Sequence, residues 1–482
     1  MHTKWMVLIE VVVGYLLAFT MILRIVLQRR EPTATLAWVL GILLLPYIGV
    51  LMYLLVGRRR LTRQVRKRLA RAAALEPHLA RLGTGIADLT APVAPDHYCK
   101  PEEREIALVS NLMGRRVPTC GNHVQLLPDA NETYQKLEEA IRGAKDHVHL
   151  LYYIYEQDET GTRFRELLTE KVKEGVTVRL LVDGVGSFGV DTFMNPMVQA
   201  GGYFAEFLPV GNLSRRWHPN LRNHRKIAII DGHIGFTGGV NIGDEYTGRK
   251  RRVGHWRDTH MCIRGPAVHH LQEVFTEDWF FATGEDLISE RWFPEQSAVG
   301  NDMVQIIASG PDTETQPMHR IFFTAVTSAQ ERVFLTTPYF VPDQAMLVAL
   351  ETAAMRGVDV RLLLPRKSDM RLVRHAGRSY YDELLQSGVK IYEYSSGILH
   401  AKSMVIDERW ATVGSANMDV RSFQLNFEVN AAVYGPDFAN QLAALFQKDL
   451  TQAQQITLED IKRKPLIARM KESLARVLSP VL

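Results

Sequence analysis

The chain contains the stretch His224-Arg-Lys226-Ile-Ala-Ile-Ile-Asp231-Gly-His-Ile-Gly-Phe-Thr-Gly-Gly239-Val-Asn241, and its spacing recurs in His400-Ala-Lys402-Ser-Met-Val-Ile-Asp407-Glu-Arg-Trp-Ala-Thr-Val-Gly-Ser415-Ala-Asn417. Both stretches follow the pattern H-x-K-x4-D-x6-G-[GS]-x-N. A single copy of so short a pattern is weak evidence, but two copies with every spacing kept indicate a duplicated functional unit. Two histidines brought together can divide a two-step phosphoryl reaction, one as nucleophile and one as acid and base.

Each stretch reads as a strand, a turn and a returning strand. Residues 226–231 and 402–407 are mostly apolar, and a glycine or a polar pair then supplies the turn. Alternate residues of a strand share a face, so the histidine and the lysine two positions later point to the same side. We expect the following Gly-Gly and Gly-Ser to let the backbone approach an anion, with the amides of Asn241 and Asn417 donating to it. The pattern therefore predicts a phosphate site.

The repeat extends beyond these stretches and predicts the fold. Val176-Thr-Val-Arg-Leu-Leu-Val182 and Val358-Asp-Val-Arg-Leu-Leu-Leu364 are nearly identical, and each follows a predicted strand and helix. Strand, helix, strand and hairpin in each half predict an α/β fold of two similar domains with mixed sheets, related by pseudo-two-fold symmetry. The expected organisation is a transmembrane helical hairpin at 1–57, a basic juxtamembrane linker at 58–100, a first domain at 101–295 and a second at 296–482.

Two N-terminal segments have the length and composition of membrane spans. Trp5 to Leu27 is apolar except for two residues, and residues 34–56 carry no charge; a span takes about 20 apolar residues. Pro46 leaves open a bent or partly inserted hairpin. Eight basic residues between 58 and 71, with no acid among them, predict that this end lies on the cytoplasmic side and attracts anionic headgroups. Residues 461–482 read equally as an interfacial amphipathic helix or as a packing helix with a solvated basic face.

The duplicated pattern resembles the signature of the phospholipase D superfamily, HxKxxxxDxxxxxxGSxN, and the resemblance covers the chain from about residue 100 onward. Gly239 departs from that signature, which usually has serine there. We therefore expect one hydroxyl contact to phosphate to be missing and the backbone donors to remain. Residues 417–430 and 29–38 are similar to the bacterial cardiolipin synthase branch of the superfamily.

The resemblance implies a cardiolipin synthase, a phosphatidyltransferase that joins two phosphatidylglycerols and releases glycerol. By that analogy His224 becomes a covalent phosphatidyl-histidine and His400 acts as acid and base, whereas the residues by themselves are symmetric. The remaining expected site residues are, for phosphate binding, Lys226, Lys402, Asn241, Asn417, Gly239 and Ser415, and, for support of the histidines or lysines, Asp231 and Asp407.

No metal or cofactor is expected, because lysines and amides fill the charge-neutralising role and no Cys-x-x-Cys or His-Glu-x-x-His pattern occurs. The expected partners are phosphatidylglycerol and other anionic lipids of the bacterial cytoplasmic (inner) membrane, with the catalytic domains facing the cytoplasm. The alternatives are a phospholipase D that hydrolyses headgroups and a nuclease of the same superfamily. The missing basic-aromatic pattern argues against nucleic acid. Glu245 and Glu428 are candidates for orienting a histidine, and His218 for contacting substrate.

Overall fold

The computed structural model describes residues 2–27, 32–54, 106, 109, 116–209, 221–249, 254–311, 315–477 and 479. The three N-terminal helices belong to one compact unit, and the described residues from 106 onward belong to a second. The predicted basic linker at 58–100 and His218 lie outside the described residues. The predicted boundary between two domains at 295 and 296 stays a prediction, because both repeats fall in the second unit.

The N-terminal unit contains α1 (His2–Val26), α2 (Pro32–Leu44) and α3 (Pro46–Met52). Pro46 separates α2 from α3 because proline has no N–H to continue a helix. The helices pack on one another around Ala18, Ile25, Ile42 and Tyr53. Within the described part of the chain, no helix combines the length and apolar character needed to cross a bilayer. The predicted helical hairpin is therefore present, and its two membrane spans are not confirmed.

The first repeat builds a mixed sheet whose three parallel strands continue into an antiparallel half. Its strand order is β4 (Tyr203–Phe207), β3 (Thr177–Asp183), β2 (His147–Tyr152), β6 (Ile227–Ile230), β7 (Ile234–Gly238), β9 (His260–Arg264) and β1 (Thr119–Leu127). The parallel pairs are β4–β3 and β3–β2. The predicted motif hairpin is β6 and β7.

The second repeat builds the same sheet from later residues. Its order is β14 (Lys390–Leu399), β13 (Asp359–Lys367), β11 (Arg332–Thr336), β15 (Ser403–Ile406), β16 (Trp410–Gly414), β18 (Asn426–Tyr434) and β10 (Asp302–Ser309). The pairs β14–β13 and β13–β11 are parallel and the others antiparallel, as in the first repeat. A further strand, β19 (Ala453–Ile456), pairs with β14. The predicted α/β fold with mixed sheets is confirmed.

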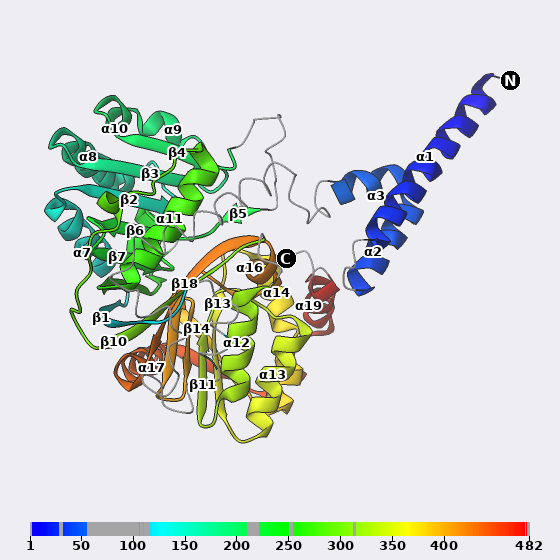
Figure 1. Cartoon of the computed structure of the whole chain (residues 1–482). Helices are drawn as coiled ribbons and strands as arrows, with labels where there is room; N and C mark the ends of the chain where they lie inside the picture. Colours follow the sequence, from blue (N-terminus) through cyan, green and yellow to red (C-terminus); the bar gives the residue numbers. More distant parts are fainter. Residues whose placement is uncertain are drawn as a thin grey trace. The chain divides into compact units, whose positions relative to one another are not determined.

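Helices cover both faces of each sheet (Figure 1). They are α7 (Ala130–Gly143), α8 (Glu159–Lys173) and α11 (Ala267–Thr283) in the first repeat, and α12 (Pro317–Ser328), α13 (Gln344–Met355) and α17 (Pro436–Leu450) in the second. One apolar core draws on α11, α17 and both sheets, with Phe446 of α17 stacked on Phe334 of β11 at 4.8 Å. β1 also pairs with β10 across the repeats. Shared core and shared strands fix the two motifs relative to each other.

The smaller elements lie at the edges and ends of these sheets. They are α9 (Val190–Phe193), α10 (Asn195–Gln199), β5 (Arg222–Asn223), η3 (Asp244–Thr247), β8 (Trp256–Arg257), η4 (Glu290–Trp292), β12 (Phe340–Val341), α14 (Arg371–Arg378), α15 (Tyr381–Gln386), β17 (Met418–Asp419), α16 (Val420–Gln424), α18 (Leu458–Lys462) and α19 (Leu466–Val477).

Candidate active site

The two motifs meet because each begins on a strand of the other repeat. β5, directly before His224, pairs with the start of β18, and the end of β14, directly before His400, pairs with β8. The backbone N–H of His224 donates to the carbonyl of Phe427 at 2.9 Å, and that of His400 donates to the carbonyl of Arg257 at 2.7 Å. Strands of the two repeats thus pair with each other at two equivalent places, and this pairing brings both histidines into one buried site.

The imidazole of His224 is held by a carboxylate from the opposite repeat. Its Nδ1 lies 3.0 Å from Oε2 of Glu428, which is fully buried, and 3.1 Å from the carbonyl oxygen of Ser415. Both neighbours can only accept, so Nδ1 carries the proton and donates it. This fixes the tautomer and leaves the lone pair on Nε2, the nitrogen that is free to react.

His400 is held in the same way, but by an acid that the sequence did not reveal. Its Nδ1 lies 2.7 Å from Oδ2 of Asp258, a fully buried residue of the first repeat. The other oxygen of Asp258 accepts the N–H of Thr259 at 2.8 Å. The expectation for Glu428 as an orienting acid is therefore confirmed by geometry, and that for Glu245 is wrong, because Asp258 occupies the equivalent place.

The use of Asp258 in place of a glutamate explains why Gly239 departs from the family signature. In the second repeat, the hydroxyl of Ser415 donates to Oε2 of Glu428 at 2.5 Å. In the first repeat, a Cβ added at Gly239 would lie 2.0 Å from Oδ1 of Asp258. The carboxylate of the shorter aspartate occupies the space that a side chain at 239 would need. Ser415 therefore serves as a hydrogen-bond donor to the carboxylate of Glu428, whereas Gly239 leaves the space that the carboxylate of Asp258 fills.

The two lysines share the same buried space, and both have pKa values far below the ordinary range. Burial, together with the positive charge of Lys402, lowers the pKa of Lys226 to about 7. Burial also lowers the pKa of Lys402 to about 8, against the opposing effect of Asp258 and Glu428. Each ammonium donates to the carbonyl of its own motif histidine, at 2.6 Å from Lys226 to His224. An arriving anion would restore the charge of both groups.

Burial likewise keeps both imidazoles neutral at pH 7. It lowers the pKa of His224 to about 4, although the charge of Glu428 acts in the opposite direction. It also lowers the pKa of His400, helped by the charge of Lys402 and opposed by Asp258. His224 is thus held strongly in the form that has a free lone pair.

Aromatic rings frame the histidines from the repeated strands. The ring of Tyr153, just after β2, meets His224 edge-on at 4.9 Å between centroids, and Lys226 lies 5.3 Å from the centre of the same ring. In the second repeat Tyr339 meets His400 edge-on at 6.5 Å, and Trp256 lies 5.2 Å from it. These rings exclude water from the imidazoles, which strengthens every electrostatic interaction at the site.

The predicted phosphate donors each have a protein partner. The side-chain amide of Asn241 donates to the hydroxyl of Tyr246 at 3.1 Å, and that of Asn417 faces the hydroxyl of Ser422 at 3.3 Å. The N–H groups of Gly239 and Ser415 donate to carbonyls of Thr259 and Val429, both at 2.9 Å. These four residues close the loops after the motif hairpins. The prediction that Gly239 and Ser415 keep their backbone donors for phosphate is wrong.

Asp231 and Asp407 also differ from expectation. Asp231 accepts the backbone N–H groups of residues 145–147, each at 2.8 Å. Asp407 accepts those of residues 330–332, with the closest contact at 2.8 Å. Both sit in the left-handed region with φ of 52°. They tie the end of the motif strand to the start of the antiparallel strand beside it, and they support neither the motif histidines nor the lysines directly.

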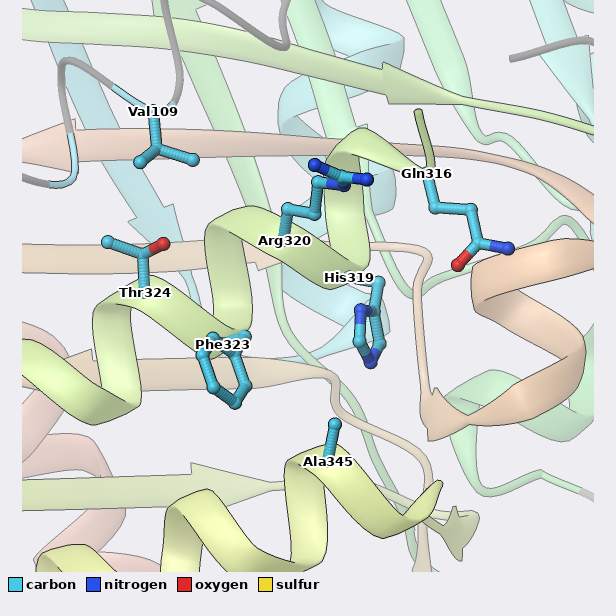
Figure 2. Close-up of a pocket in the computed structure, with 7 residues that line it drawn as sticks. All are labelled: Val109, Gln316, His319, Arg320, Phe323, Thr324 and Ala345. Atoms are coloured by element: carbon cyan, nitrogen blue, oxygen red, sulfur yellow. The ribbon is translucent and has the colours of Figure 1, made fainter. Parts of the chain in front are cut away.

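A separate hollow of about 540 Å³ lies between α12 and α13 (Figure 2). It is lined by Val109, Gln316, His319, Arg320, Phe323, Thr324 and Ala345. His319 forms an ion pair with Asp343 at 2.8 Å if it is protonated. None of the residues predicted for the phosphate site lines this hollow.

A duplicated His-x-Lys site on paired mixed sheets defines a phospholipase D-like enzyme. The family described as cardiolipin synthase, PLD-like domain matches residues 137–279 and 322–450, and a phospholipase D-nuclease N-terminal family matches residues 16–58. The chain therefore belongs to the family of phospholipase D-like cardiolipin synthases, which are phosphatidyltransferases.

Two curated relatives and one solved structure show how far the similarity reaches. The cardiolipin synthase of Geobacillus sp. (strain WCH70) is 40% identical over 460 residues, covering 95% of this chain and 90% of that one. The major cardiolipin synthase ClsA of Bacillus subtilis (strain 168) is 37% identical, covering 98% of both. The phosphatidylserine synthase of Haemophilus influenzae Rd KW20 superposes with a TM-score of 0.61 at 12% identity, covering 78% of this chain and all of that one. This last likeness shows the shared fold.

Replacing Asp407 by alanine should lower stability without changing the chemistry. Burial raises the pKa of Asp407, but the amides of residues 330–332 and the guanidinium of Arg409 outweigh it, so the net pKa is lowered. We expect Asp407→Ala to reduce the free energy of unfolding by about 2–3 kcal/mol, because charged hydrogen bonds are lost and their donors are left without partners. Denaturant unfolding and kcat of the folded fraction are the measurements.

The stability that Asp407 contributes should also depend on pH in a predictable direction. A carboxylate whose pKa is lowered by folding contributes its full stability above its unfolded pKa of about 3.9 and loses it as pH falls through the folded value. The difference between wild type and Asp407→Asn should therefore shrink below about pH 4. The exposed neighbour Glu408 is the control, and Glu408→Ala should change stability by less than about 0.5 kcal/mol. A fall in kcat at unchanged stability would contradict a structural role.

Any side chain at position 239 should displace the acid that orients His400. Because the Cβ of Gly239→Ala would lie 2.0 Å from Asp258, we expect kcat to fall by about 100-fold, the usual effect of a misplacement of about 1 Å. Gly143→Ala is the control, since a Cβ there meets nothing within 4 Å. Steady-state turnover and thermal unfolding should be compared for both. Wild-type kcat in Gly239→Ala would show that the close approach has no role in catalysis.

Proposed function

We propose that this chain joins two phosphatidylglycerol molecules into cardiolipin and glycerol through a covalent phosphatidyl-histidine. The observation that carries the proposal is the pair of imidazoles, each held at Nδ1 by a buried carboxylate of the other repeat, beside two buried lysines. One imidazole can attack phosphorus while the other moves the proton, and the lysines supply positive charge where a phosphodiester binds.

In the first step, Nε2 of His224 attacks the phosphorus of one phosphatidylglycerol. The bond between phosphorus and the glycerol oxygen breaks, and Nε2–H of His400 gives its proton to that oxygen. His400 must be protonated for this step, and the negative phosphodiester raises its proton affinity when it binds. The products are glycerol, a phosphatidyl group on His224 and a neutral His400.

In the second step, neutral His400 takes the proton from a hydroxyl of the second phosphatidylglycerol. That oxygen attacks phosphorus and the bond between phosphorus and Nε2 of His224 breaks. Cardiolipin leaves, His224 regains its free lone pair and His400 is again protonated. Atoms and charges balance without any added energy source, because one phosphodiester is exchanged for another.

The structure favours His224 as the nucleophile, a choice that the symmetric sequence motifs leave open. Its pKa is lowered to about 4 by burial, which secures the free lone pair at neutral pH. The acid beside His400 lies closer, at 2.7 Å against 3.0 Å, and a nearby carboxylate stabilises the imidazolium that the proton donor must form. Lys226 and Lys402 neutralise charge on the non-bridging oxygens.

We further propose that the enzyme works at the bacterial cytoplasmic membrane, with phosphatidylglycerol and other anionic lipids as its partners and the catalytic unit on the cytoplasmic side. The N-terminal helices support membrane association because they expose large apolar side chains, among them Trp5, Leu16, Phe19 and Leu44. The N-terminal match to a phospholipase D-nuclease family covers residues 16–58, which include the second half of α1 and all of α2 and α3. Membrane spanning by the hairpin remains part of this proposal.

A substrate whose leaving group needs no acid can distinguish the catalytic roles of the two histidines. With p-nitrophenyl phosphatidate, His400→Ala should release about one equivalent of p-nitrophenol and then stop, because His224 still attacks but no base activates the acceptor. His224→Ala should release none. With phosphatidylglycerol, both variants should lose transfer. Stopped-flow absorbance and lipid chromatography are the measurements.

The matched control is His233→Ala, because His233 is exposed in the turn of the first motif hairpin; it should keep wild-type turnover. A burst from His224→Ala with none from His400→Ala would reverse the assigned roles. Phosphatidic acid as the main product of wild type would indicate hydrolysis and contradict the proposed transfer.

A further inference from the structure

Helix α19 turns its large apolar side chains away from the protein. The fractional exposures are 71% for Leu466, 69% for Ile467, 54% for Met470, 65% for Leu474 and 74% for Val477. At about 100° of rotation per residue, these positions fall within an arc of about 100° on one side of the helix. A surface helix normally buries such a stripe, so the arrangement in α19 is inverted.

The inward face of α19 is small and polar, and ion pairs hold it in place. Ala475 and Glu472 are buried. Glu472 pairs with Lys464 at 2.9 Å, and Arg476 pairs with Glu383 of α15 at 2.9 Å. The guanidinium of Arg476 also lies 4.4 Å from the centre of the Tyr380 ring. Because these contacts fix the rotation of the helix, the apolar stripe cannot turn inward without breaking them.

Basic residues border the exposed stripe. Arg469 and Lys471 are exposed on its two sides. The neighbouring helix α14 packs against α19 (Figure 1), and its first turn adds exposed Arg371 and Leu372. An apolar stripe with cations along both borders has the composition of a helix that lies in the interface of an anionic membrane.

This surface is connected to the active site through the start of α14. Asp369, two residues before that helix, accepts a hydrogen bond from the hydroxyl of Tyr339 at 2.6 Å. The ring of Tyr339 packs against His400. A surface that seats α14 and α19 on a bilayer would therefore hold a direct neighbour of the active site close to the lipid headgroups.

We propose that α19, with the first turn of α14, is a docking surface for an anionic phospholipid bilayer. The five apolar side chains enter the acyl-chain boundary, and Arg469 and Lys471 contact the headgroup phosphates. The docking itself is independent of the transfer reaction, whereas its effect on turnover rests on the proposed function. Charge complementarity selects this occupant over a second copy of the chain or the N-terminal helices.

A fluorophore at position 474 tests the contact with lipid directly. The full-length chain, with Cys99, Cys120 and Cys262 replaced and Leu474→Cys labelled with nitrobenzoxadiazole, is reconstituted in phosphatidylglycerol vesicles whose acyl chains are brominated. We expect at least half of the emission to be quenched. The same label at Met355→Cys is the control, because Met355 is 70% exposed at the end of α13 and lies outside the stripe; it should stay unquenched.

Emission at 474 that reports an apolar environment without quenching by bromine would mean that protein covers the stripe, and it would overturn the proposal. Emission typical of the fluorophore in an aqueous environment, with no quenching, would also overturn the proposal. Neither outcome depends on catalysis, so the failure of docking is distinguishable from failure of the proposed reaction.

Turnover gives a second, independent readout. Ile467→Gln combined with Leu474→Gln should lower transfer in phosphatidylglycerol vesicles by about tenfold, and leave transfer of short-chain phosphatidylglycerol in detergent micelles unchanged. Met355→Gln should change neither. An equal loss in vesicles and micelles would indicate a folding defect and contradict docking, as would full activity of the double variant in vesicles.

Discussion

The hydrogen bond between a histidine Nδ1 and a carboxylate of the opposite repeat is the interaction on which the rest of the structure depends. It occurs twice, between His224 and Glu428 and between His400 and Asp258. Burial alone would raise the pKa of both acids, but the lysine charges and the hydrogen bonds from the histidines outweigh it, and the pKa of each is lowered. Both acids therefore stay ionised in a site that excludes water. Neither repeat alone contains a complete pair, so the active site exists only where the two sheets share a core.

The same charges explain why the site is suited to a phosphodiester. Burial is the main cause of the low pKa values of Lys226 and Lys402, and repulsion from the charge of Lys402 contributes to the low pKa of Lys226. A negative ligand removes that repulsion, and the enzyme thereby keeps its favourable electrostatic energy for the step in which charge develops on the phosphoryl oxygens. Fixing both imidazoles before substrate arrives avoids reorganisation during the reaction. These features depend on burial, which the aromatic rings and the apolar core maintain.

Sequence reasoning identified the features that follow from local pattern. The duplicated motif, the mixed sheets and the family could be predicted because spacing and alternation are visible in the residues. Asp258 could not, because it lies 17 residues after Asn241 whereas Glu428 lies 11 after Asn417. The two acids are equivalent in space and not in sequence. Once the position of Asp258 is known, the glycine at 239 is explained, because a side chain there would collide with this carboxylate.

The misassigned residues have a common physical reason. Asp231 and Asp407 lie five positions from the motif lysines, at the far end of the strand, and no sequence rule shows which backbone amides meet them there. The side-chain amides of Asn241 and Asn417 contact Tyr246 and Ser422, and their role in binding phosphate stays a prediction. The apolar segment at 34–56 is interrupted at Pro46, because proline cannot continue the helix whatever the hydropathy of its neighbours.

The protonation state of His224 tests the central claim most directly. Nitrogen-15 spectra of the full-length chain, labelled at histidine and reconstituted in lipid nanodiscs, distinguish protonated from bare ring nitrogens, and the His224→Gln variant assigns the signal. At pH 7 we predict a neutral ring with the proton on Nδ1 and a bare Nε2. A proton on Nε2, or an imidazolium, would contradict the account, because the carboxylate of Glu428 would then not be setting the reactive nitrogen.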